Sequence, residues 1–196
     1  MKCATCKKKE CYIDGKDCTG KRDEFKSAYV GDDKAVHYVA AEIEAKHYMK
    51  YTRLEEIIEF SRKMRYGKLG IAFCIGLEKE AQVLSAILEK DFEIESVCCK
   101  VCGIDKGEIG LPKIEGGNPE RRETMCNPIT QAKLLNQAGT DLNIVLGLCV
   151  GHDILFSKYS QAPLTTFAVK DRVLGHNPLA AVYTRYYRKK NFGLKE

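Results

Sequence analysis

Ten cysteines are the residues of this 196-residue chain whose type and spacing offer the most chemistry. Cysteine thiolates ligate zinc and iron, and they also cycle through disulfides. No hydrophobic stretch follows Met1, so the sequence predicts a cytoplasmic protein without a secretory signal. Because structural disulfides are disfavoured in the cytoplasm, the clustered thiols indicate metal binding or redox chemistry.

One group of cysteines lies in the first thirty residues. Its members are Cys3, Cys6, Cys11 and Cys18, and lysine, aspartate and glycine surround them. A segment with so little to bury cannot fold on its own hydrophobic core, and four thiolates around a metal would organise it. We therefore predict a metal-binding arm over residues 1–31, followed by an α/β domain over residues 32–196 that opens with helices.

The rest of the chain alternates helical and strand-like patterns. Apolar spacing predicts helices over residues 32–64, and Thr52 with Glu55 forms a capping box that starts a new helix near Arg53. Asn127 and Asn177 each precede proline and are predicted to cap helices. Four nearly continuous apolar segments, separated by helices, read as strands over residues 69–76, 92–99, 142–148 and 164–169. They predict a mostly parallel, Rossmann-like three-layer sheet with helices on both faces.

A second group of thiols follows these predicted strands, where parallel sheets bind their ligands. It consists of Cys74, Cys98, Cys99, Cys102, Cys126 and Cys149. We predict that this edge binds a cofactor, with Cys99, Cys126 and Cys149 as the metal ligands. Cys74 fits equally well as a small buried hydrophobe within its strand.

Histidine and aspartate side chains collect at the same predicted edge. His152, Asp171 and His176 are candidate catalytic groups, because histidine titrates near neutrality and can manage protons. Asp153 fits a simple helix cap at least as well. Lys100 and Lys170 could contact an anionic ligand, although most surface lysines are only solvated.

The cysteine spacing favours iron–sulfur over zinc. Structural zinc sites typically combine two C-x2-C pairs, whereas Cys3/Cys6 and Cys99/Cys102 lie in different structural contexts. Cysteines from separate loops suit a [4Fe–4S] cluster, one or two of them, with zinc as the alternative. A third hypothesis is thiol redox chemistry, with a disulfide forming at Cys98/Cys99 or Cys99/Cys102. Adjacent cysteines form a disulfide only with strain, which weakens the first of these pairs.

Several motifs together resemble the domain-of-unknown-function family 1847, a group of prokaryotic proteins. They are the cysteine arm, GIAFCIGL at 70–77, the Cys98-Cys99-Lys100 turn, Cys126-Asn127-Pro128 with Gln131-Ala132, GLCVGHD at 147–153, and APLTTFAVKDRVLGHNP at 162–178. The resemblance covers essentially the whole chain. It implies metal binding through these cysteines and no assigned reaction.

Charge and hydropathy narrow the remaining functions. The net charge of +5, from 32 basic and 27 acidic residues, is a mild excess, and no apolar run approaches the roughly 20 residues of a membrane span. The basic C-terminal run from Arg185 to Lys190 is explained by solvated helix ends, so nucleic acid is not the favoured partner. The sequence thus predicts an iron–sulfur protein, either an enzyme with an open metal position or an electron carrier, that meets a small-molecule or redox partner. The alternative is a non-catalytic zinc protein or metal carrier or sensor.

Overall fold

The computed structural model describes residues 1–118 and 120–194, so the last two residues of the predicted second domain lie outside it. The chain divides into two compact units, Met1–Tyr51 and the part that begins at Thr52. The sequence placed the boundary before the long first helix, whereas in the structure this helix belongs to the first unit. Within the described residues, no helix has the length and apolar character needed to cross a membrane.

The first unit is held mainly by local polar contacts. Its elements are η1 (Cys3–Thr5), α1 (Glu10–Ile13), α2 (Arg22–Lys26) and α3 (Gly31–His47). The Asp17 carboxylate accepts the amides of Thr19 at 2.9 Å and Gly20 at 3.0 Å, and that of Arg22 at 3.0 Å. The Thr19 hydroxyl also donates to this carboxylate at 2.8 Å, and this bond first, then the amide bonds, lower the pKa of Asp17 to about 2. One carboxylate therefore shapes the turn that leads into α2.

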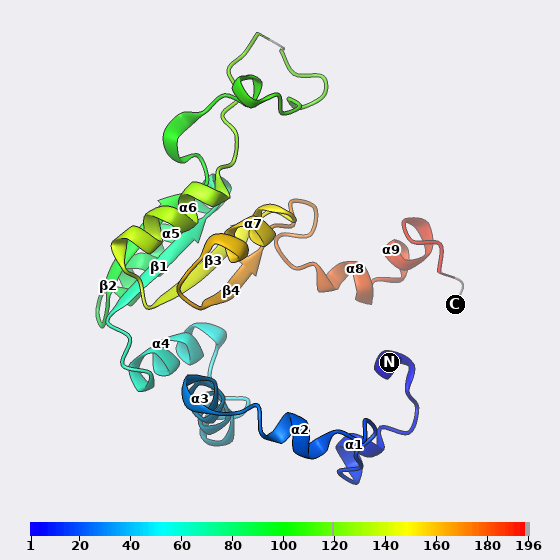
Figure 1. Ribbon diagram of the computed structural model, residues 1–196. Helices are drawn as coiled ribbons and strands as arrows, with labels where there is room; N and C mark the ends of the chain where they lie inside the picture. Colours follow the sequence, from blue (N-terminus) through cyan, green and yellow to red (C-terminus); the bar gives the residue numbers. More distant parts are fainter. Residues whose placement is uncertain (119, 195–196) are drawn as a thin grey trace. The chain divides into compact units, whose positions relative to one another are not determined.

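The second unit is built on a four-stranded sheet in which every strand is parallel to its neighbours (Figure 1). The strands are β1 (Lys68–Phe73), β2 (Glu93–Cys98), β3 (Leu142–Leu148) and β4 (Leu164–Val169), in the order β2-β1-β3-β4. Helix α4 (Arg53–Lys63) precedes the first strand, and α5 (Glu78–Leu88), α6 (Pro128–Ala138) and α7 (His152–Tyr159) connect successive strands. The predicted parallel α/β architecture is confirmed.

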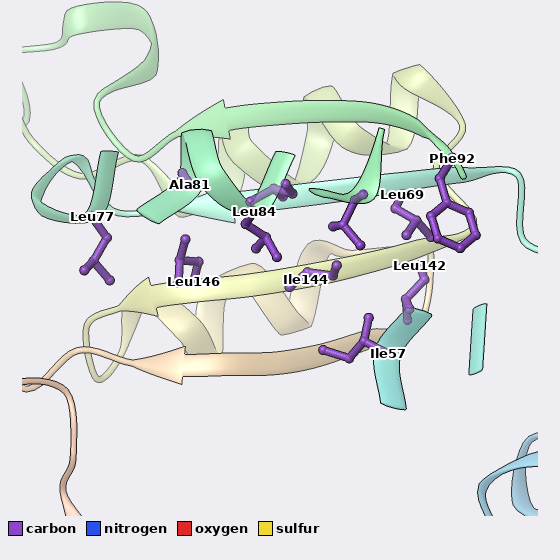
Figure 2. Packing of buried hydrophobic residues seen from close by; sticks show 11 residues of the cluster. Ile57, Leu69, Leu77, Ala81, Leu84, Phe92, Leu142, Ile144 and Leu146 are labelled. Carbon is purple, nitrogen blue, oxygen red and sulfur yellow. The ribbon is translucent and has the colours of Figure 1, made fainter. Parts of the chain in front are cut away.

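Both faces of this sheet are buried, because successive side chains of a strand point to opposite faces. On one face, Leu69, Ile144 and Leu146 pack against Ala81 and Leu84 of α5 (Figure 2). The opposite face packs against α6 and α7, through Ala72, Val145, Leu135 and Phe156. Double burial explains why the two central strands, β1 and β3, are continuous apolar runs in the sequence, whereas the edge strands β2 and β4 are only partly buried.

Two of the predicted helix starts are confirmed. The Thr52 side chain accepts the Glu55 amide while the Glu55 carboxylate returns to the Thr52 amide, completing the capping box of α4. Asn127 caps α6 by accepting the Thr130 amide at 3.2 Å, and Pro128 occupies the first helical position. These local contacts fix the direction in which each helix leaves its loop.

The predicted cap at Asn177 is wrong. The C-terminal segment forms two short helices, α8 (Leu179–Tyr183) and α9 (Arg185–Lys190), and α8 follows Pro178 without any side-chain cap. The chain arrives through a tight turn in which the His176 amide bonds to the Asp171 carbonyl at 2.8 Å. His176 is left-handed there, with φ of 65°, so this turn sets the chain path before the helix begins.

A long excursion connects β2 to α6 and closes on itself beyond the strand ends (Figure 1). It carries the short helices η3 (Val101–Gly103) and η4 (Lys106–Ile109). Its outgoing and returning arms meet at an antiparallel bridge between Asp105 and Thr124. The Asn127 amide then bonds to the Cys99 carbonyl at 2.8 Å. This closure returns the chain, and with it Cys126, to the end of β2.

Close packing of β1 against the Asn143 side chain of β3 and Leu135 of α6 makes a glycine necessary at position 70. A methyl group on Gly70 would collide with the Asn143 amide oxygen and lie 3.0 Å from Leu135. Asn143 cannot move aside easily, because it already bonds to the Thr140 hydroxyl at 2.9 Å and to the Ser160 hydroxyl at 2.8 Å.

We expect Gly70→Ala to destabilise the second unit by about 1–3 kcal/mol through overpacking. The matched control is Gly67→Ala, whose added methyl would find its nearest neighbour at an ordinary 3.9 Å. Urea unfolding followed by circular dichroism would compare the two. Equal transition midpoints would contradict the close packing of Gly70 against Asn143 and Leu135.

Candidate functional site

Three cysteines from distant parts of the sequence meet at the carboxyl end of the sheet. Cys74 follows β1, Cys99 follows β2, and Cys126 immediately precedes the cap of α6. The Cys99 thiol hydrogen-bonds with both Cys74 and Cys126, so it is the middle member of the group. Cys74 and Cys99 are 7% and 2% exposed, while Cys126 is half-buried. We call these three residues the thiol trio.

Main-chain pairing brings the trio together. The parallel register sets Phe73 opposite Cys98, so the next residue of each strand also falls side by side. The Cys99 amide bonds to the Phe73 carbonyl at 2.8 Å, and the Ile75 amide points at the Cys99 sulfur at 3.4 Å. Closure of the excursion then supplies Cys126. The trio therefore follows from strand register and one loop closure.

The trio divides into two thiolates and one protonated thiol. Hydrogen bonding from Cys99 is the first cause that lowers the pKa of Cys74 and of Cys126 to about 5. The same contacts, with Cys126 first and Cys74 second, raise the pKa of Cys99, because its single proton is shared between the two neighbouring sulfurs and the protonated form is thereby favoured. Near neutral pH the two outer sulfurs are therefore anionic and the central one keeps a proton.

Cationic side chains surround these sulfurs. The Lys100 ammonium lies 3.5 Å from the Cys126 sulfur and donates to the Thr124 carbonyl at 2.6 Å. Lys170, directly after β4, hydrogen-bonds to Cys74. Both contacts contribute to the low pKa values of the outer thiols, because a positive charge stabilises a thiolate.

Cys149, a predicted ligand, lies beside the trio and has a different partner. It directly follows the last residue of β3, and its sulfur accepts from the Arg172 guanidinium at 3.2 Å. This contact is the first cause of a raised pKa for Arg172, and the charges of Cys74 and Cys126 add to it. The charges of Cys149, Cys74 and Cys126 therefore all act on Arg172, although among these sulfurs its guanidinium contacts only Cys149.

The other two sheet-edge cysteines lie outside the trio. The Cys98 sulfur is half-buried and accepts the Lys100 amide at 3.4 Å. Cys102 is exposed, and its backbone has a left-handed conformation with φ of 68°. All ten cysteines of the chain are free thiols.

The predicted catalytic groups divide by what they contact. His152 begins α7 and is half-buried, and its charge favours the Cys126 thiolate. Asp171 and His176 instead build one turn, in which Nδ1 of His176 accepts the Asp171 amide at 3.0 Å. That bond places the proton of a neutral His176 on Nε2. Asp153 lies in the first turn of α7 and accepts the amides of Gly151 and Ile154, while the N-cap residue of this helix is Gly151 and no side-chain cap bond forms there.

Gln131 is a site residue that the sequence reasoning did not identify. Its side chain is fully buried, and its amide group donates to the carbonyls of Phe73 at 3.2 Å and Val97 at 2.7 Å. It thereby joins α6 to the last residues of β1 and β2, just before the trio cysteines. Its side-chain oxygen has no hydrogen-bond partner in the structure. A glutamine on an otherwise apolar face of α6 was the available signal.

The arm cysteines are all exposed, and the structure brings two of them together. Loss of contact with water raises the pKa of Cys18 first, and the neighbouring Cys11 raises it further through its charge and a hydrogen bond. Cys6 instead has a lowered pKa, because the amides of Lys9 and Lys8 bond to its sulfur. The four arm thiols do not converge on one point.

The donor chemistry of the trio suits a soft metal ion, since thiolates are the preferred ligands of zinc and iron–sulfur clusters. Its present spacing does not form a ready cage. Among residues 1–118 and 120–194, no group of three or more His, Cys, Asp and Glu side chains is placed to hold a metal ion. Ligation would require the shared thiol proton to leave and the sulfurs to turn toward a common centre.

Comparison with known proteins places the chain among uncharacterised relatives. A sequence model of the family described as "Protein of unknown function (DUF1847)" matches residues 14–167. The "Uncharacterized protein MJ0455" of Methanocaldococcus jannaschii is 58% identical over 197 residues, which cover 97% of each chain. No solved structure matches the chain significantly.

The hydrogen bonds of the trio predict an unusual thiol titration. In reduced, metal-free protein, ultraviolet thiolate absorbance should show two thiols ionising near pH 5, well below the ordinary value of 9.0. Cys99→Ala should raise both pKa values, because it removes the shared donor, whereas the exposed Cys102→Ala should not. If all ten thiols titrate together near their ordinary value, this hydrogen-bond arrangement is wrong.

The same shifts give a direction for stability against pH. A pKa that is lower in the folded protein stabilises the fold above the unfolded value, and this stabilisation is lost as pH falls through the folded value. The contribution of Cys74 and Cys126 should therefore be full above about pH 9 and absent below about pH 5. Urea unfolding of the wild type and Cys99→Ala across this range would measure it.

Proposed function

Since the chain belongs to the family described as "Protein of unknown function (DUF1847)", we propose its function from the sheet edge: a thiolate-bound metal centre, most consistent with iron–sulfur. Cys74, Cys99 and Cys126 are the proposed ligands. The observation that carries the proposal is the meeting of three thiols from segments 25 or more residues apart, at the edge where parallel sheets bind ligands.

The number and type of donors favour iron–sulfur over structural zinc. A structural zinc site is closed by four ligands, whereas three cysteines on a cubane leave one iron without a protein ligand. Cys149 is a further thiol of this edge, and its sulfur accepts from the Arg172 guanidinium at 3.2 Å. A cluster would supply electron transfer or a Lewis-acidic iron at this edge.

The surroundings of the trio also suit an anionic sulfur-rich group. The Ile75 amide is directed at the Cys99 sulfur at 3.4 Å, and Lys100 and Lys170 contact the outer thiols. Hydrogen bonds and positive charges of this kind stabilise cysteine sulfur at clusters and tune their potentials. Gln131 would keep the strand ends in register while the thiols turn.

Further groups of this edge have proposed roles toward a small-molecule or redox partner. His152 is the candidate proton carrier, because it lies at the start of α7 and its charge contributes to the lowered pKa of Cys126. His176 presents Nε2 while Asp171 holds its Nδ1, so Asp171 acts as a positioning residue. These roles apply if the centre is catalytic rather than purely electron-carrying.

A second centre on the arm is a separate part of the proposal. Cys11 and Cys18 are already adjacent, and ligation of a metal would bring Cys3 and Cys6 to them. Metal binding would thus complete the folding of a segment that has few apolar residues to bury. Ten free thiols are consistent with the reducing cytoplasm, where we place the protein.

Anaerobic purification followed by iron, sulfide and zinc analysis tests the proposed function directly. We expect broad visible absorbance with iron and sulfide in equal amounts. Cys126→Ser and Cys99→Ala should each remove the sheet-edge share of the metal while the fold, followed by circular dichroism, persists. Cys102→Ser is the matched control, because this thiol is exposed and lies outside the trio.

Three other outcomes would each contradict a defined part of the proposal. A colourless protein with stoichiometric zinc would replace iron–sulfur with a zinc site. A metal-free protein whose trio forms a disulfide on mild oxidation would favour thiol redox chemistry, with Cys99 exchanging between Cys74 and Cys126. Full metal retention in Cys126→Ser would show that the trio is not the ligand set.

A further inference from the structure

The C-terminal tail, residues 178–194, exposes several large apolar side chains. Single exposed apolar side chains are normal in a folded protein, whereas a group of them in one segment marks a surface that meets a partner. Six side chains of the tail are each more than half exposed: Leu179, Val182, Tyr183, Tyr186, Phe192 and Leu194. Solvated helix ends account for the basic residues of this tail but not for these apolar ones.

The same tail carries positive charge and no acidic residue. Its basic residues are Arg185, Arg188, Lys189 and Lys190, and the sequence has no aspartate or glutamate between residues 172 and 194. In the whole chain, by contrast, 27 acidic residues nearly balance 32 basic ones. A segment that combines clustered cations with exposed apolar side chains is complementary to a surface that is both anionic and apolar.

Hydrogen bonds within the tail give it a defined shape. The Arg188 guanidinium of α9 donates to the carbonyls of Val182 at 3.0 Å and Tyr183 at 2.8 Å, the last two residues of α8. The Leu194 amide returns to the Arg188 carbonyl at 3.0 Å. The apolar side chains are therefore exposed on a folded segment, which loses less conformational freedom on binding than an extended chain would.

We propose that the C-terminal tail binds the surface of an anionic lipid membrane. Its apolar side chains insert among the lipid headgroups, and its lysines and arginines lie beside the lipid phosphates. Helices of five and six residues are too short to cross a bilayer, so the tail lies along the surface. Buried apolar area and attraction to anionic lipids both strengthen binding of this kind. The inference does not depend on the proposed metal centre.

The aromatic residues of the tail fit a lipid surface better than a nucleic acid. Stacking of a base requires an open ring face. The Lys190 ammonium lies 5.0 Å from the ring centroid of Tyr186, and the Tyr187 ring stands nearly perpendicular to that of Tyr186 with the centroids 5.4 Å apart. Tyrosine is favoured where a bilayer meets water, because its ring is apolar and its hydroxyl is polar. Exposed Leu179 and Leu194 gain an apolar environment from lipid, whereas a phosphate backbone offers them none.

Sedimentation of the purified full-length protein with phospholipid vesicles tests the electrostatic part of this inference. We expect binding to vesicles that contain phosphatidylglycerol, weaker binding to phosphatidylcholine alone, and release as salt rises. The double variant of Lys189→Gln and Lys190→Gln should weaken binding by about fivefold for each charge removed. The matched control is the double variant of Lys79→Gln and Lys90→Gln, which removes two exposed positive charges in and next to α5.

Tryptophan fluorescence tests the apolar part of the inference. The chain has no tryptophan, so Tyr183→Trp provides a single reporter on α8. Its emission should shift to shorter wavelength when vesicles that contain phosphatidylglycerol are added, because the ring leaves water. Tyr48→Trp is the matched control without a shift, because Tyr48 is 69% exposed and Tyr183 is 71% exposed.

Each of four outcomes would overturn the lipid surface as the partner. One is a protein that stays in solution with the anionic vesicles, and binding of a single-stranded polyribonucleotide would then assign the tail to nucleic acid. Equal weakening in the two lysine pairs would show that binding reflects net charge alone. An unshifted emission in Tyr183→Trp would show that α8 stays in water, and an equal shift in Tyr48→Trp would show that the contact is not confined to the tail.

Discussion

The hydrogen bond from the Asn127 amide to the Cys99 carbonyl, at 2.8 Å, holds together the two ends of the excursion that separates them in sequence. Closing a loop of this length costs roughly 3 kcal/mol of chain entropy, more than one such bond returns. Further main-chain hydrogen bonds also stabilise the closed loop. The Met125 amide bonds to the Ile104 carbonyl at 2.9 Å, and the Lys106 amide bonds to the Glu123 carbonyl at 3.0 Å. Without this closure Cys126 would not meet the strand ends, and the trio would be a pair.

The remaining two thiols meet for a different reason, which is the parallel register of β1 and β2. Parallel strands end at the same edge, so residues that follow them in sequence become neighbours in space. The sheet supplies rigidity from both faces, whereas the excursion contributes one ligand from a loop. A site built this way is held on two sides by the core and can adjust on the third.

Much of this arrangement could be predicted from the sequence. Continuous apolar runs predicted the parallel sheet, and Asn127-Pro128 predicted the start of α6, because both signals depend on local burial and capping. The identity of the trio could not be predicted. Cys74 looked as much like a core residue as a ligand, and only the register shows it beside Cys99. Cys149 is predicted among the ligands, and the cation that contacts its sulfur, Arg172, comes from a different loop and could not be foreseen.

The cap expected at Asn177 shows the limit of local signals. The same two residue types begin α6, where the Asn127 side chain is 6% exposed and the chain enters from a bonded stem. At Asn177 the preceding turn is fixed by Asp171 and His176, so the helix starts later and without the cap. The local sequence therefore predicts where a helix can start. Whether the side-chain cap forms depends also on the conformation of the chain that precedes it. The same dependence applies to the thiols, whose chemistry is set by the neighbours that register and loop closure bring to them.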